Sequence, residues 1–100
     1  MRVKSDTSVK GLAQSIDAEL ESADSVCLQA CGHHAINQMV KGIAASQAIV
    51  PGGVYAIPDF THFQGNRGDE ISGIQMIVRR NRRMDDANQA TTRDRTTPQD

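Results

Sequence analysis

Apolar residues recur at helical spacing over residues 8–21. Asp6, Thr7 and Ser8 stand at the start of this segment, and side chains of these types commonly cap a helix N-terminus. The pattern predicts a first helix with one buried face. Its apolar positions are Val9, Leu12, Ala13, Ile16 and Leu20.

A second helical pattern begins after Gly32 and ends near Gln47. The N–H groups at such a helix start can hold an anion, but no phosphate-loop signature accompanies Gly32, so a tight turn is the favoured interpretation. The polar side of the helix carries Asn37, Gln38 and Lys41. The apolar residues recur at i, i+3, i+4, i+7 and i+8, which predicts one buried stripe formed by Ile36, Met39, Val40, Ile43 and Ala44.

The remaining apolar segments are typical of β-strands. Residues 26–30 predict an interior strand, residues 54–57 a strand that ends at Pro58, and residues 70–79 a closing strand. A short edge strand is expected around Val3. Residues 58–69 are then a long loop, and long loops often carry function. The order β-α-β-α-β-β predicts a two-layer α/β sandwich with both helices on one face of a four-stranded mixed sheet.

Composition limits the chain to one small domain. We expect a folded domain over residues 1–83 and a disordered polar tail over residues 84–100, because the tail holds almost nothing to bury. The chain is 38% hydrophobic with three aromatic residues, Phe60, Phe63 and Tyr55, so its core is mainly aliphatic. Small aliphatic cores are marginally stable alone, which predicts a homo-oligomer, a dimer or a tetramer.

The charge is almost balanced along the chain, with 11 Lys and Arg against 12 Asp and Glu. Residues 1–78 hold five basic and eight acidic residues, and residues 79–100 hold six and four, so positive charge concentrates near the C-terminus. This balance argues against unspecific DNA coating. The N-terminus has no apolar run typical of a signal peptide, and no segment is apolar for long enough to span a bilayer. We expect a cytoplasmic protein that does not bind membranes.

Cysteine and histidine residues are clustered in Cys27-x-x-x-Cys31-x-His33-His34. These are zinc-ligand types, but their spacing is poor and His62 would supply only part of a second ligand pair, so core thiols are favoured and no metal is expected. The sequence contains no nucleophile elbow, phosphate loop or dinucleotide fingerprint. We therefore predict that the protein is not an enzyme and needs no cofactor.

Short motifs in four segments point to a known family. They read Ser8-Val9-x-Gly11-x-Ala13, Asn37-Gln38-x-Val40-Lys41, Ile57-Pro58-x-Phe60 and Ile74-x-x-Ile77-Val78 before arginine. In these motifs the chain resembles the bacterial stage V sporulation protein S family over about residues 3–80. The resemblance implies an Alba-like fold, dimers or higher oligomers, and a role proposed to involve nucleic acid. Family members usually have small residues where this chain has His33-His34, and Alba proteins that coat chromatin are more basic, so DNA packaging is disfavoured.

Cationic and aromatic residues of the C-terminal half are candidates for nucleic-acid contact. Arginines neutralise phosphates, and aromatic rings in the predicted loop offer stacking surfaces for bases. We predict modest, salt-dependent binding of DNA or RNA through Lys41, Phe63, Arg67, Arg79, Arg80, Arg82 and Arg83. The alternative is a homo-oligomeric protein-interaction or assembly module without nucleic-acid binding, in which the arginines only keep the protein soluble. The near-neutral net charge favours that alternative.

Overall fold

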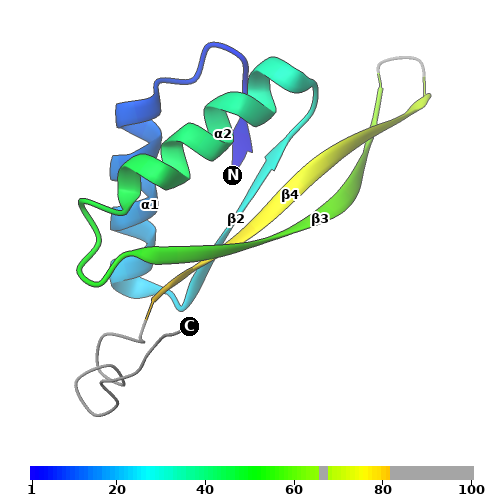
Figure 1. Ribbon diagram of the computed structural model, residues 1–100. Helices are drawn as coiled ribbons and strands as arrows, with labels where there is room; N and C mark the ends of the chain where they lie inside the picture. The colour runs from blue at the N-terminus through cyan, green and yellow to red at the C-terminus, as the bar shows by residue number, and fades with distance from the viewer. Residues whose placement is uncertain (66–67, 82–100) are drawn as a thin grey trace, which may run out of the picture.

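Two helices cover one face of a four-stranded sheet (Figure 1). The computed structural model describes residues 1–65 and 68–81. The strand order is β1-β2-β4-β3, with β1 parallel to β2 and both other pairs antiparallel. The two-layer α/β sandwich and the order β-α-β-α-β-β predicted from the sequence are confirmed. The elements are β1 (Arg2–Val3), α1 (Val9–Ser22), β2 (Ser25–Ala30), α2 (His33–Ser46), β3 (Val54–Gln64) and β4 (Glu70–Arg80).

Both helix starts follow from local backbone chemistry. Ser8 caps α1, because its Oγ accepts a hydrogen bond of 3.1 Å from the N–H of Gly11. The chain enters α2 through Gly32, whose φ of +88° lies in a region that residues with a Cβ rarely adopt. A Cβ at Gly32 would meet nothing within 4 Å, so the backbone angle and not the available space favours glycine there.

The core lies between the helix layer and the sheet. Alternate residues of β2, namely Val26, Leu28 and Ala30, point toward the helices and are buried, because successive side chains of a strand point to opposite faces. From α1 the predicted residues Leu12, Ala13, Ile16 and Leu20 are buried, so the predicted face of the first helix is confirmed.

The predicted buried stripe of α2 is partly wrong. Met39 and Ile43 are buried as expected, but Val40 is 46% exposed and Ala44 is exposed as well. The face that packs inward instead includes Ala35, Gly42 and Ser46. Gly42 lies against Leu12 of α1 so closely that a Cβ there would be 2.4 Å from Leu12 Cδ2. The contact between the two helices therefore rotates α2 away from the face that apolar spacing predicts.

The predicted end of β3 at Pro58 is also wrong, and residues 58–69 do not form a long loop. β3 continues through Pro58 to Gln64 and pairs with β4 along its whole length. The N–H and C=O of Val54 bond to the side chain of Gln47 and therefore point away from β4. Pro58 has the same orientation by the strand's two-residue period, so the sheet does not need its missing N–H. The result is a long hairpin arm that extends beyond the helices (Figure 1).

Candidate nucleic-acid interface

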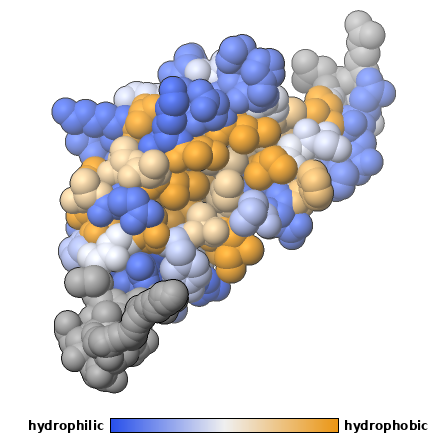
Figure 2. Space-filling model, in the orientation of Figure 1, coloured by the Kyte–Doolittle hydropathy of each residue, from blue (hydrophilic) through white to orange (hydrophobic). Residues whose placement is uncertain are grey.

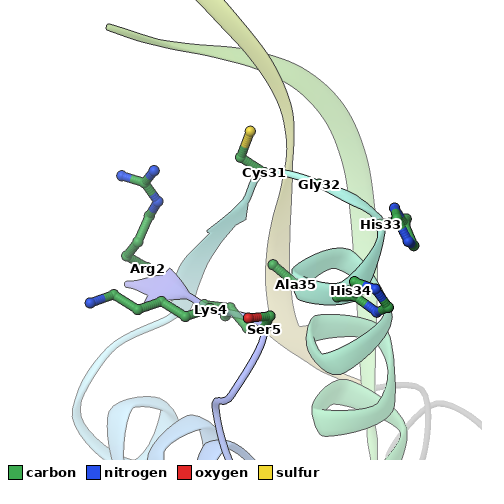
Figure 3. A pocket seen from close by; sticks show the side chains of 9 residues that line it. Arg2, Lys4, Ser5, Cys31, Gly32, His33, His34 and Ala35 are labelled. Atoms are coloured by element: carbon green, nitrogen blue, oxygen red, sulfur yellow. The ribbon is translucent and has the colours of Figure 1, made fainter. Parts of the chain in front are cut away.

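A cavity of about 490 Å³ lies where β1, the end of β2 and the start of α2 meet (Figure 3). Arg2 and Lys4 border it on one side, and His33 and His34 border it on the other. The two imidazole rings lie 4.1 Å apart between centroids. The full lining is Arg2, Val3, Lys4, Ser5, Cys31, Gly32, His33, His34 and Ala35. Four residues with nitrogen-bearing side chains thus line one hollow of the surface, and the two imidazole rings point away from Arg2 and Lys4 (Figure 3).

The start of α2 adds to the positive character of this cavity. Gly32 has no side chain that could accept hydrogen bonds from the first-turn N–H groups. The helix is 14 residues long, and the aligned peptide dipoles place partial positive charge at this end. The acidic end of α1 lies elsewhere, because Glu21 and Asp24 line a different hollow together with Arg80. The acidic residues at the end of α1 therefore lie toward the other end of β2, where Arg79 and Arg80 also lie.

Phe63 connects the hairpin arm to this basic region. The guanidinium carbon of Arg2 lies 4.0 Å from the centroid of the Phe63 ring. The ring packs on Gly73 of β4, where a Cβ would approach Phe63 Cε2 to 2.5 Å. Phe63 is therefore held between the backbone of β4 and the cation of Arg2.

The structure does not bring the sequence-predicted site residues together. Lys41 is exposed on α2, whereas Arg79 lies on the sheet face away from the helices, opposite Tyr55. Arg80 turns to the other side, where its Nε donates a hydrogen bond of 3.3 Å to the carbonyl of Leu20. Phe63 pairs with Ile71, eight residues before Arg79 along β4, which corresponds to about 26 Å. Arg67, Arg82 and Arg83 lie outside the described residues, as does the predicted tail over residues 84–100.

The sequence patterns did not predict that Arg2, Lys4 and the two histidines share one surface. Arg2 and Lys4 do stand on either side of Val3 in the predicted edge strand. Their position beside the histidines follows only from the parallel pairing of Arg2 with Gln29 and of Val3 with Ala30. That long-range contact places β1 beside the start of α2.

Exposed and partly buried apolar side chains of α2 and the hairpin arm lie on the helix side of the sheet. Val40 is 46% exposed and Phe60 is 76% exposed, which is unusual for side chains of this kind. Figure 2 shows apolar surface that continues past the helix layer. Phe60 and Pro58 lie opposite Ile74 and Met76, both partly buried against the core. We call Ile36, Val40, Pro58, Phe60, Ile74 and Met76 the helix-side patch.

The outer edge of β3 has fewer free backbone groups near this patch than an ordinary strand edge has. Gln47 covers both groups of Val54, and the Asp59 carboxylate accepts the N–H of Phe60 at 2.8 Å. Pro58 has no N–H to donate. A partner would therefore gain little from adding a strand to β3 and more from packing against side chains.

Cysteine chemistry remains simple in the described part of the chain. Cys27 Sγ lies 3.9 Å from Gln75 Oε1, and Cys31 Sγ lies 3.5 Å from the carbonyl of Ser72. Both cysteines are free thiols. Over residues 1–65 and 68–81, no three His, Cys, Asp or Glu side chains are grouped so that they could hold a metal ion. Among these same residues no helix has the length and apolar character needed to cross a bilayer.

The fold is an Alba-like fold of the α/β class. The structure is similar to that of Alba from Thermoplasma volcanium, with a TM-score of 0.57 and 15% identity over 80% of this chain and 100% of that chain. At this identity the likeness shows the fold alone. The family model for stage V sporulation protein S matches residues 1–81, so the chain belongs to that family, as its motifs indicated. None of the curated proteins matches the chain.

Proposed function

We propose that this protein binds nucleic acid through the basic end of its sheet. The observation that carries the proposal is the cavity bordered by Arg2, Lys4, His33 and His34, with Phe63 beside it. Phosphates are the anions that such a surface suits, because guanidinium and ammonium groups neutralise them and release condensed counterions. Membership in the stage V sporulation protein S family supports the same proposal.

The net charge of −1 is compatible with a local site of this kind. Arg2 and Lys4 lie at one end of β2, and the acidic residues Glu21 and Asp24 lie near the other. A phosphate at the cavity would therefore lie beside the positive charges of Arg2 and Lys4, while salt screens charges farther away than about 8 Å. The expected binding is modest, since few phosphates are neutralised at once.

We further propose that the protein acts as a homodimer, in the cytoplasm and without catalysis. The helix-side patch supports the dimer, because Val40 and Phe60 would lose contact with water when a second copy packs there. An assembly module without nucleic-acid binding is the second candidate function, and the same patch favours it. The two candidates differ in whether the cationic surface has a ligand.

Fluorescence anisotropy with labelled DNA and RNA across a salt series tests the proposal. The parent protein should bind, and its affinity should fall as salt rises. Arg2→Gln with Lys4→Gln should weaken binding and reduce the salt slope by roughly one unit per lost phosphate contact. Arg82→Gln with Arg83→Gln tests the sequence-predicted cluster in the same way, and Lys10→Gln on α1 is the matched control for lost charge.

The outcomes separate the candidate functions. A loss confined to the first double variant places the phosphates at the cavity, and a loss confined to the second places them at the arginine cluster. If no labelled nucleic acid binds at low salt, the nucleic-acid proposal is wrong and the assembly module remains.

A further inference from the structure

The sheet face away from the helices carries an arginine beside an aromatic ring at each end. We call this the open face. At the arm end, Arg2 lies over the ring of Phe63. At the other end, Tyr55 and Arg79 are directly opposite each other in the β3–β4 pair, and both are exposed. Directly opposite residues of an antiparallel pair project to the same side, so all four side chains belong to one face.

We infer that the open face binds single-stranded nucleic acid, with bases stacked on Arg2 and Tyr55 and phosphates beside Arg2 and Arg79. The inference rests on the proposed function and names its substrate class. Bases stack on aromatic rings and on arginine planes only when they are not already paired inside a duplex. A surface built from these groups therefore prefers single strands.

The two stacking groups are presented differently. The Phe63 ring packs on Gly73 and has the Arg2 guanidinium carbon 4.0 Å from its centroid, so at least one of its faces is covered. The exposed guanidinium of Arg2, rather than the ring beneath it, is the group that this end offers to a base. Tyr55 is 46% exposed and offers its own ring. One end thus presents an arginine plane, and the other presents an aromatic plane.

The surface between these ends suits a flexible strand. Tyr55 and Phe63 are eight residues apart on β3, about 26 Å, which matches roughly eight nucleotides at the rise of a stacked strand. Ile57, which is 54% exposed, provides apolar contact between them. Among the described positions of β2, β3 and β4 that face this side, Asp59 is the one acidic residue. Its carboxylate accepts the N–H of Phe60.

The test compares a labelled 12-nucleotide single strand with its duplex by fluorescence anisotropy at one low salt concentration. The single strand should bind more tightly. Tyr55→Ala should weaken single-strand binding about 5- to 150-fold, the loss expected for one stacked base, whereas Tyr55→Phe keeps the ring and should restore most of the affinity. Arg2→Lys keeps the charge but removes the plane, so it should also weaken binding. Lys10→Gln should leave the affinity unchanged.

Three results would overturn the inference alone. The first is a duplex affinity equal to or above that of the single strand. The second is single-strand binding that survives both Tyr55→Ala and Arg2→Lys, which would leave the proposed function standing at another surface. The third is a change of oligomer mass by light scattering on Tyr55→Ala with unchanged single-strand binding, since it would assign the open face to a second copy of the chain. If neither nucleic acid binds, the inference and the proposed function both fail.

Discussion

Gly42 of α2 is the position where adding a single methyl group should be most informative. A Cβ at this residue would lie 2.4 Å from Cδ2 and 2.7 Å from Cγ of Leu12. Leu12 is only 4% exposed and belongs to the core, so its side chain has little room to move aside. Gly42→Ala should therefore force the two helices apart or drive Leu12 out of its rotamer.

Two opposing effects set the magnitude. Replacing glycine by alanine inside a helix favours folding by about 1 kcal/mol. Overpacking a close-packed core typically costs about 1 to 3 kcal/mol, and two contacts this short place Gly42→Ala in the upper half of that range. We expect a net loss of about 1 to 2 kcal/mol in the free energy of unfolding.

Gly11→Ala is the matched control, because it changes the same residue type in the neighbouring helix. A Cβ at Gly11 would meet only Ser8, at an ordinary distance of 3.5 Å. Gly11→Ala should stabilise the protein by up to about 1 kcal/mol, because alanine favours a helix more than glycine does. Helix propensity counts for less in the first turn, so the gain is smaller if that position reduces it. Urea unfolding measures the free energy of unfolding of Gly42→Ala and Gly11→Ala. The protein concentration is kept fixed, because the stability of a dimer depends on it. Equal stabilisation by the two variants would refute the close helix contact.

The remaining predictions concern the core, the oligomer and the C-terminal segment. Ile43→Ala removes a side chain that is 8% exposed and should cost about 2 to 5 kcal/mol in urea unfolding; a cost below about 1 kcal/mol would contradict its place in the core. Val40→Asp with Phe60→Asp should convert a dimer into a monomer in size-exclusion chromatography with light scattering, and an unchanged mass would exclude the helix-side patch as the interface. Truncation after Met84 should leave the melting temperature nearly unchanged, and a large drop would mean that this segment stabilises the domain.

Local patterns in the sequence determined most of the fold. The N-cap at Ser8 and the spacing of Leu12, Ile16 and Leu20 specified α1, because a cap and an apolar stripe depend only on residues of the same helix. The apolar run ending at Ala30, followed by Gly32, specified β2 and the turn into α2. The family motifs identified the architecture before any contact was known.

Tertiary contacts decided the rest. Pro58 predicts a strand end when considered alone, but it is compatible with β3 because its backbone faces the outer edge of the sheet. Val40 fits the apolar spacing of α2, yet the close contact between Gly42 and Leu12 leaves it exposed.

The candidate site depends even more on long-range pairing. Arg2 contacts Phe63 although the two residues are 61 positions apart in the sequence. The cavity forms only because β1 pairs beside the end of β2 and next to the start of α2. The sequence determined which residues are cationic or aromatic and which segments carry them. Only the tertiary structure decided which of them share a surface, because helical and strand periodicities act within an element and not between distant elements.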